Sequence, residues 1–221
     1  GGVLTLNTPI TTSDTEVYMA PAGVTPFAYI DDSAGKKLIY ECRFKLSVLE
    51  LQGLFLGFGD PAIAAENLVD TTCIPQANAS WLGFWVDDAT LKFGWQYGSA
   101  VAFGTGHELV TAPTHATSLI STGATAWTKT LVAATWYKLG FVYDPRSSAS
   151  RRIVVYVDGA EVGAVPAGCL GAWDGPHTTY TGSVNFPHQV YLPVFMGFKA
   201  STSPTVAHIA YVDWFRAYQE G

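Results

Sequence analysis

LIYECRFKLSV, residues 38–48, carries the clearest structural signal in this chain of 221 residues. Apolar and polar side chains alternate along it, with one face made of Tyr40, Cys42, Phe44, Leu46 and Val48 and the other of Glu41, Arg43, Lys45 and Ser47. A period of two is typical of a β-strand that buries one face and exposes the other. The stretch therefore predicts a strand with one side toward water.

Strand signals continue on the C-terminal side of this stretch. GLFLGFGD, residues 53–60, has no polar face and predicts a central strand. WLGFWV and LKFGWQY, residues 81–86 and 91–97, predict a hairpin joined by a four-residue loop at 87–90. These two hairpin arms and the central strand hold much of the aromatic content of the first half.

The second half of the chain repeats the pattern. TWYKLGFVYD, residues 135–144, and RRIVVYVDG, residues 151–159, predict two strands, the second followed by an Asp-Gly turn. QVYLPVFMGFK, residues 189–199, contains Pro193, which indicates an edge strand or a bulge. A last strand is expected over residues 208–219.

This order of elements predicts the fold class. We expect about nine to twelve short strands, one helix at residues 60–70, and loop-rich stretches at 98–130 and 163–188. Without alternating helices, the pattern favours an all-β, antiparallel two-sheet β-sandwich of jelly-roll type over a parallel α/β fold. Residues 1–221 are expected to form a single domain, with residues 1–34 as a candidate N-terminal extension or arm.

Composition excludes several classes of protein. The net charge is −6 and no basic run exceeds two residues, which argues against nucleic-acid binding. No apolar run is long enough to span a membrane. The three cysteines, Cys42, Cys73 and Cys169, have neither disulfide-framework nor zinc-site spacing, and no cofactor is expected. Charged residues make up only 14%, which indicates a surface poor in charge.

The motifs WYKLGFVYD, VVYVDG and YVDWFRAYQ together resemble the concanavalin A-like jelly-roll superfamily of lectins, laminin-G-like modules and laminarinase-type glucanases. The longer series GKKLIYECRFKLS, GLFLGFGD, WYKLGFVYD, NFPHQVYLPVFMGFK and VDWFRAYQ is similar to uncharacterised structural proteins of tailed-phage virions. The resemblance covers most of the chain from about residue 35 onward. It implies a concanavalin A-like jelly roll and suggests either carbohydrate recognition or a structural role in a virion.

No catalytic or metal site is expected. Retaining glucanases of that superfamily carry an E-x-D-x-x-E or E-x-D-x-E pattern, which places two carboxylates about 5 to 5.5 Å apart across the sugar bond. This sequence lacks the pattern, and its acidic pairs Asp31-Asp32 and Asp87-Asp88 stand in turn-like contexts. No H-x-H, H-E-x-x-H or calcium-loop motif is present. The chain is therefore predicted not to be an enzyme.

The terminal strand is expected to be scaffolding. Strict alternation places Ile209, Tyr211, Asp213, Phe215 and Ala217 on one face and Val212, Trp214, Arg216 and Tyr218 on the other. Asp213 would then stand in a mostly apolar row and need hydrogen bonds from amides, a tyrosine or a tryptophan, or a place at the sheet rim. Asp213 and Arg216 are not expected to pair.

Several predicted strands are apolar on both faces, at 54–58, 81–86 and 190–198. Their outer faces are covered either by the loops at 98–130 and 163–188 or by neighbouring subunits, and both alternatives stay open. The hairpin could instead offer aromatic platforms to sugars beside polar groups. The candidate glycan-binding residues are Trp81, Trp85, Asp87, Trp95, Gln96 and Tyr97.

The leading functional hypothesis is a non-enzymatic virion structural protein, a capsid-associated decoration protein of a tailed phage. Its partners would be capsid subunits or copies of itself, in a homo-oligomer, and its location the virion. The alternative is a carbohydrate-binding, lectin-like module that binds surface glycans and could be secreted. A glycoside hydrolase of the same fold is the third hypothesis.

Overall fold

The computed structural model describes residues 2–8, 16–19, 27–30, 36–50, 52–59, 80–96, 129–147, 151–165, 190–200 and 206–221. These residues contain fourteen β-strands and no helix, and none of their segments could cross a membrane as a helix. The helix expected at residues 60–70 lies outside the described ranges. The strands are β1 (Leu4–Thr8), β2 (Glu16–Met19), β3 (Ala28–Ile30), β4 (Leu38–Leu46), β5 (Gln52–Gly59), β6 (Trp81–Asp87), β7 (Thr90–Gln96), β8 (Lys129–Thr130), β9 (Tyr137–Tyr143), β10 (Ile153–Val157), β11 (Ala160–Val165), β12 (Val190–Leu192), β13 (Val194–Ala200) and β14 (His208–Gln219).

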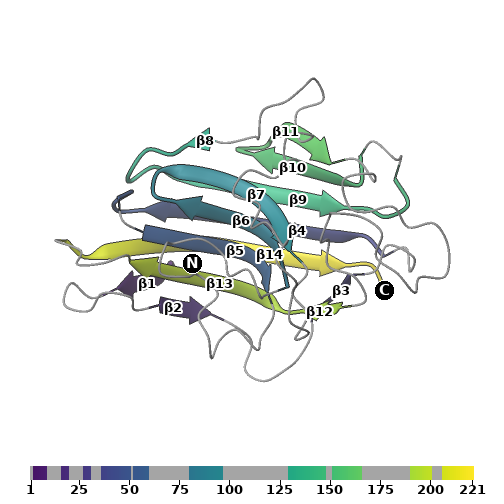
Figure 1. Cartoon of the computed structure of the whole chain (residues 1–221), viewed down its shortest axis with the longest axis horizontal. Coiled ribbons are helices and arrows are strands. Elements are labelled where there is room, and N and C mark those ends of the chain that lie inside the picture. The colour runs from purple at the N-terminus through teal and green to yellow at the C-terminus, as the bar shows by residue number, and fades with distance from the viewer. Residues whose placement is uncertain are drawn as a thin grey trace, which may run out of the picture.

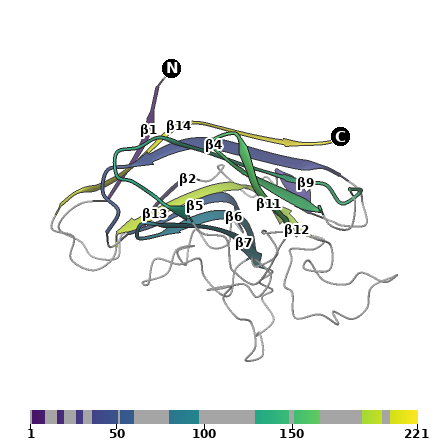
Figure 2. The ribbon, with the colours of Figure 1, turned by 90° about the horizontal axis from the view of Figure 1, so that it is seen from above.

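The strands form two stacked antiparallel sheets (Figures 1 and 2). Sheet A has the order β1-β14-β4-β9-β10-β11, and sheet B has the order β2-β13-β5-β6-β7-β8. A small third sheet pairs β12 with β3. Figure 2 shows the two large sheets edge-on, with sheet A above sheet B. The predicted all-β, antiparallel two-sheet β-sandwich is confirmed.

The core lies between the two sheets. Strand β4 alternates strictly between buried and partly exposed residues, as its sequence predicts. Aromatic rings fill the centre, where Phe141 of β9 lies 5.6 Å from Tyr40 and 6.0 Å from Phe58, measured between ring centroids. Each fully buried side chain of this size contributes about 1.5–3 kcal/mol of burial free energy. This packing of one sheet against the other is what makes the outer face of sheet A a rigid platform.

Strand β5 is central in sheet B, as predicted, but the neighbouring hairpin is tighter than expected. Asp87 and Thr90 pair with each other across β6 and β7, so the loop contains only Asp88 and Ala89. The four-residue loop predicted at 87–90 is therefore wrong. Asp88 adopts a φ of 50°, a left-handed conformation that Asp tolerates better than most residues. This conformation lets each strand continue one residue further toward the turn than the sequence pattern indicates.

The structure also shows the outcome at the predicted Asp-Gly turn, at Pro193 and in the N-terminal stretch. Asp158 and Gly159 both have positive φ and form the predicted turn between β10 and β11. Pro193 separates β12 from β13, so it ends one strand and precedes another that belongs to a different sheet. The N-terminal stretch 1–34 contributes β1, β2 and β3, and its described residues are strands that pair with β14, β13 and β12.

The terminal strand β14 contains a β-bulge between Val212 and Trp214. Val212 lies opposite Phe44 on the inner face, whereas Trp214 lies opposite Arg43 on the outer face. The extra residue, Asp213, reverses the parity of everything after it. The predicted assignment of Val212 and Trp214 to one face is therefore wrong, because a strict period of two does not survive a bulge.

The central aromatic side chains on the outer face of sheet B are buried within the single chain. Phe55, Trp81, Trp85 and Phe195 project from this face and are at most 3% exposed. A neighbouring subunit is thus not required to cover these aromatic side chains. The loops expected to cover them, at 98–130 and 163–188, lie almost entirely outside the described residues.

Candidate functional site

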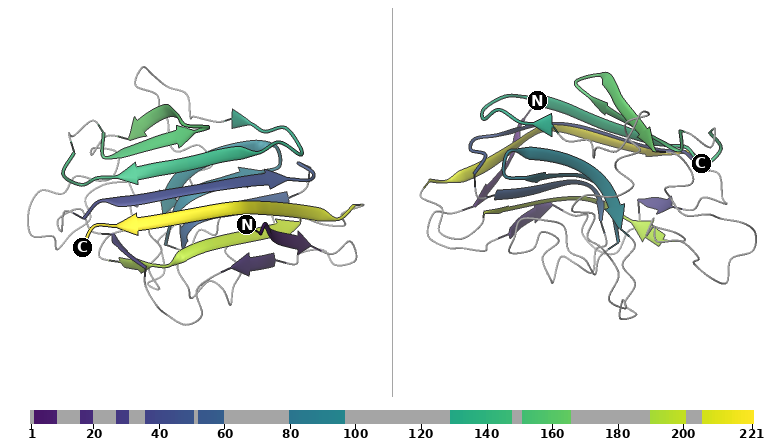
Figure 3. Two further views of the ribbon diagram at one scale, coloured as in Figure 1. Left: turned by 180° about the vertical axis from the view of Figure 1, so that it is seen from behind. Right: turned by 45° about the horizontal axis from the view of Figure 1, so that its top comes forward.

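The outer face of sheet A carries a hollow that is built around a glycine. Arg216 of β14, Glu41 of β4, Gly140 of β9 and Tyr156 of β10 lie side by side in register across four strands. Figure 3, left, views sheet A from this side. Because Gly140 has no side chain, the row is interrupted at β9, and a hollow of about 600 Å³ opens there.

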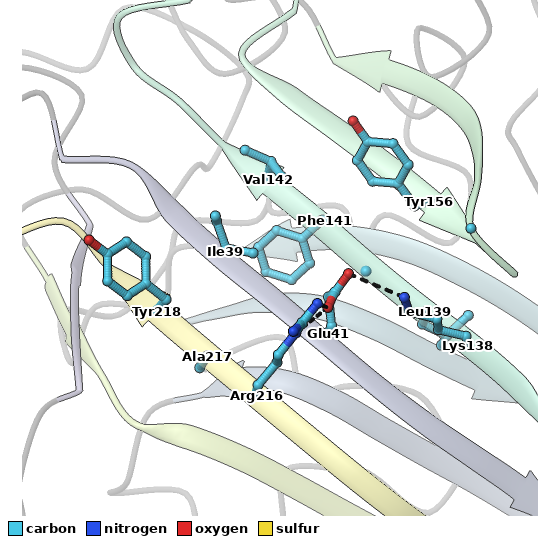
Figure 4. A pocket seen from close by; sticks show the side chains of 12 residues that line it. Ile39, Glu41, Lys138, Leu139, Phe141, Val142, Tyr156, Arg216, Ala217 and Tyr218 are labelled. Atoms are coloured by element: carbon cyan, nitrogen blue, oxygen red, sulfur yellow. Dashed lines mark hydrogen bonds and ion pairs between the residues drawn. The ribbon is translucent and has the colours of Figure 1, made fainter.

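Two tyrosines stand on either side of the hollow (Figure 4). Tyr156 rises from β10 and Tyr218 from β14, with the apolar side chains of Ile39 and Val142 between them. Tyr218 is 57% exposed. A ring flanked by apolar surface on a rigid sheet presents a flat face to a ligand without loss of conformational freedom on binding.

Charged groups line the side of the hollow opposite these apolar residues. The guanidinium of Arg216 donates to Oε2 of Glu41, and Nζ of Lys138 lies 3.6 Å from Oε1 of the same carboxylate. Figure 4 shows Glu41 between the two cations. The lining thus combines cationic donors, one carboxylate and the rings and hydroxyls of two tyrosines, a mixture suited to hydroxyl-rich ligands.

Beyond the hollow, the same face carries a cation–aromatic strip, made of Arg43, Lys45, Trp136, Lys138, Tyr211, Trp214 and Arg216. Arg43 and Lys45 each lie 4.8 Å from the centre of the Trp136 ring, and Lys45 also lies 4.7 Å from the Tyr211 ring. Lys138 and Arg216 stand over Trp214 at 5.7 and 5.9 Å. These cation–π contacts hold the long basic side chains in place.

The structure divides the predicted glycan-binding residues between two faces. Trp95, predicted as a sugar platform, is part of the core between the sheets and is 3% exposed. It lies opposite Leu82 in the register, and an inward position leaves it no route to a ligand. Trp81 and Trp85 project outward from sheet B but are 1% and 3% exposed, and their rings contact each other at 5.4 Å.

The remaining members of that set form no described platform either. The carboxylate of Asp87 accepts a hydrogen bond from Lys92 at 2.7 Å. The side chain of Gln96 and the whole of Tyr97 lie outside the described residues. The hairpin therefore does not bring the predicted set together in the part of the structure that is described.

The hollow has one carboxylate, and the bulged aspartate is paired elsewhere. Hydrolysis of a glycosidic bond requires two carboxyl groups facing the scissile bond. Glu41 is the single acidic residue among those that line the hollow. Asp213 accepts a 2.7 Å hydrogen bond from Arg43 and does not pair with Arg216, as predicted. The partner that the described residues supply to Asp213 is thus an arginine, where an amide, a tyrosine or a tryptophan was expected.

The described residues contain neither an arranged group of metal ligands nor a reactive thiol. No group of three or more His, Cys, Asp or Glu side chains within them is arranged to hold a metal ion. Cys42 is fully buried beneath the hollow's strands, and burial raises the pKa of its thiol to about 12. Such a thiol stays protonated at neutral pH and is a poor nucleophile.

No protein-family model matches this sequence, and no curated protein matches it. Among solved structures, the carbohydrate recognition domain of Emp47p is 12% identical and superposes with a TM-score of 0.51, covering 99% of this chain and 89% of its own. The fold is concanavalin A-like. A protein of unknown function from Shewanella oneidensis MR-1 is also 12% identical, with a TM-score of 0.48 over 96% of this chain and 69% of that one.

A third similar structure is the β-glucanase of Bacillus licheniformis. It is 14% identical, with a TM-score of 0.44 over 92% of this chain and 78% of the glucanase. At 12% identity the likeness to the Emp47p domain concerns the fold alone, and a fold does not imply a function. Function therefore has to be argued from the site.

Sequence reasoning missed the hollow, although part of its signal was readable. The outward positions of residues 38–48 include Glu41, and alternation from the buried Leu139 marks Gly140 as outward on the next strand of the sheet. A glycine at an outward position between larger residues indicates a gap in the surface. Arg216 and Tyr218 could not be assigned to the same face as Glu41 and Gly140, because the sequence pattern does not reveal the bulge at Asp213.

Proposed function

We propose that this chain is a non-enzymatic carbohydrate-binding module that holds a sugar residue in the hollow over Gly140. The observation that carries the proposal is the pair of tyrosines, Tyr156 and Tyr218, on either side of a glycine floor beside Glu41, Arg216 and Lys138. Flat aromatic rings pack against the apolar face of a sugar, while charged groups satisfy its hydroxyls. The hollow's volume of about 600 Å³ is in the range of small-ligand sites.

Two further points support a binding role without chemistry. The lining offers a single carboxylate, which two cations neutralise, so no proton donor and nucleophile face each other. The Emp47p domain, a carbohydrate recognition domain by its description, has the same fold. That likeness shows a fold compatible with sugar recognition, and the assignment to this chain is ours.

The test is a glycan array followed by calorimetric titration of the best-bound oligosaccharide. Tyr218→Ala removes one wall of the hollow and is expected to weaken binding about tenfold, the equivalent of about 1.4 kcal/mol. Tyr191→Ala is the matched control, because Tyr191 is equally exposed, at 58% against 57%, and belongs to β12 outside the hollow.

The variants also have to keep the fold, which unchanged far-ultraviolet circular dichroism and thermal midpoint would establish. Equal affinity of wild type and Tyr218→Ala for every bound glycan would contradict the proposed site. Absence of binding to any glycan on the array would contradict the proposed function itself.

A structural role in a virion is the second candidate, and the unpaired edge of β14 favours it. β1 pairs with β14 only from His208 to Val212, so no described strand pairs with the outer edge of residues 213–218, and at Gln219 the side chain exchanges hydrogen bonds with the backbone of Tyr29 in β3. Phe215 on this segment is 41% exposed. Open strand edges accept strands from other chains, including copies of the same chain. The chain in stoichiometric amounts in purified phage particles would support this role, with capsid subunits or copies of itself as partners.

A further inference from the structure

We infer that the ligand of this face is an acidic polysaccharide, bound with one residue in the hollow and its carboxylates or sulfates on the cation–aromatic strip. The inference rests on the proposed function and specifies the class of glycan. Its basis is the distribution of charge over the outer face of sheet A.

That distribution opposes the charge of the whole chain. The strip and the hollow together carry four cations, Arg43, Lys45, Lys138 and Arg216, and two carboxylates, Glu41 and Asp213. The strip and the hollow therefore have an excess of two positive charges on a chain whose net charge is −6, and the neighbouring pairs Asp158 with Lys129 and Glu161 with Arg151 add no net charge. Concentration of the minority charge on one face attracts anionic ligands to that face.

The cationic side chains are also fixed in position and keep hydrogen-bond donors for a ligand. Lys45 has no carboxylate partner among the described residues and is held by the rings of Trp136 and Tyr211. Arg216 and Lys138 share the one carboxylate of Glu41, which leaves donors on both cations for further acceptors. Because these side chains are fixed by aromatic contacts, an anion that binds them costs little side-chain entropy.

The hollow and the strip are continuous. Lys138 and Arg216 belong to both, since they line the hollow and stand over the ring of Trp214. Trp214 lies opposite Arg43 in the register, one pair of residues along from the Arg216–Glu41 row. A chain of sugars that enters the hollow can thus extend across β14 and β4 toward Lys45.

An acidic glycan fits this face better than a nucleic acid. Single strands need successive aromatic faces that are free to stack on bases. Here Trp136, Tyr211 and Trp214 already have cations over their rings, and the two tyrosine walls are separated by the glycine floor.

The experiment compares ligands by calorimetric titration with the full chain. Hexagalacturonate and a chondroitin sulfate hexasaccharide are the acidic probes, laminarihexaose is the neutral probe, and a twelve-nucleotide oligothymidylate is the nucleic-acid probe. We expect an acidic hexasaccharide to bind about tenfold more tightly than the neutral one. Its affinity should fall as ionic strength rises from about 0.01 M to about 0.15 M, where screening shortens from about 30 Å to about 8 Å.

Lys45→Gln tests the strip separately from the hollow. It is expected to weaken binding of the acidic probe about two- to fivefold and to leave the neutral probe unaffected. Lys92→Gln is the charge-matched control, because Lys92 belongs to β7 of sheet B, on the other layer of the sandwich, and pairs there with Asp87. That control variant should bind both probes as the wild type does.

The outcomes separate the inference from the proposed function. If laminarihexaose binds as tightly as the acidic probes and Tyr218→Ala weakens both, the sugar site stands and the acidic preference is wrong. If no oligosaccharide binds, both are wrong. Tighter binding of oligothymidylate than of any sugar would overturn the inference in favour of nucleic acid.

Discussion

At the scale of single residues, burial determines which groups can titrate or react. His208, the first residue of β14, is 3% exposed, and burial lowers the pKa of its imidazole below the ordinary value of about 6.5. The neutral form is favoured in the folded protein, whereas the unfolded chain binds a proton below about pH 6.5. His208 therefore links the stability of the chain to pH.

We expect the free energy of unfolding to decrease as pH is lowered through about 6.5, because the unfolded state then binds more protons than the folded state. The His208→Gln variant should lose this part of the pH dependence, and the other four histidines are common to both proteins. Urea unfolding of both at several pH values between 5 and 8 measures the difference. Identical pH profiles would show that His208 does not titrate on unfolding.

Single residues also mark the limit of the sequence pattern. Strict alternation places Asp213 in a mostly apolar row, yet it is the extra residue of a bulge and pairs with Arg43. Nothing local distinguishes a bulge from a regular position, since the extra residue is defined by its partner strand. Gly140, in contrast, could be placed on the outer face by alternation. That it forms the floor of a hollow could not be predicted, because this depends on residues of the neighbouring strands.

At the scale of elements, the close approach of β5 and β6 depends on two facing glycines. Gly57 and Gly83 lie opposite each other, and a Cβ on Gly57 would come within 2.7 Å of the Gly83 Cα and collide with the Leu82 carbonyl oxygen. Both obstacles are backbone atoms, which cannot move aside as a side chain can. These two strands are thus paired more closely than side chains at this position would allow.

Gly57→Ala is expected to destabilise the chain by about 3 kcal/mol, because the two strands must separate locally. Gly159→Ala is the comparison, since Gly159 has a φ of +82° but no atom within 4 Å of an added Cβ, and should cost only about 1 kcal/mol. Chemical denaturation of the three proteins gives both differences. A smaller loss for Gly57→Ala than for Gly159→Ala would contradict the close pairing.

Elements were also what the sequence predicted best. β4 and β5 have a strict alternation and an unbroken apolar run, and both are found as predicted, β4 half-buried and β5 central. The hairpin loop was overestimated because its first and last residues, Asp87 and Thr90, are polar but belong to the strands. Polarity alone does not end a strand where one face of the sheet accepts polar side chains.

At the scale of the whole molecule, the fold class followed from the sequence and the strand order did not. The pairing of β1 with β14 joins Leu4 to Val212 across nearly the entire chain, and no local pattern encodes such a contact. The candidate site depends on this long-range order, because Tyr218, Glu41, Gly140 and Tyr156 come from four strands that are adjacent only in the folded sheet. The hairpin was a more obvious candidate because its aromatic residues are adjacent in sequence.

The most direct test of the proposed site is a spectrum of the chain with ring-labelled tyrosine, recorded by nuclear magnetic resonance during titration with the glycan that binds best. Of the eleven tyrosines, Tyr156 and Tyr218 line the hollow, and substitution of each by Phe assigns its signal. We predict that the signals of these two tyrosines shift and saturate together while those of Tyr191 and the buried Tyr143 stay in place. Saturable shifts at other tyrosines, with Tyr156 and Tyr218 unchanged, would contradict the placement of the sugar on the outer face of sheet A.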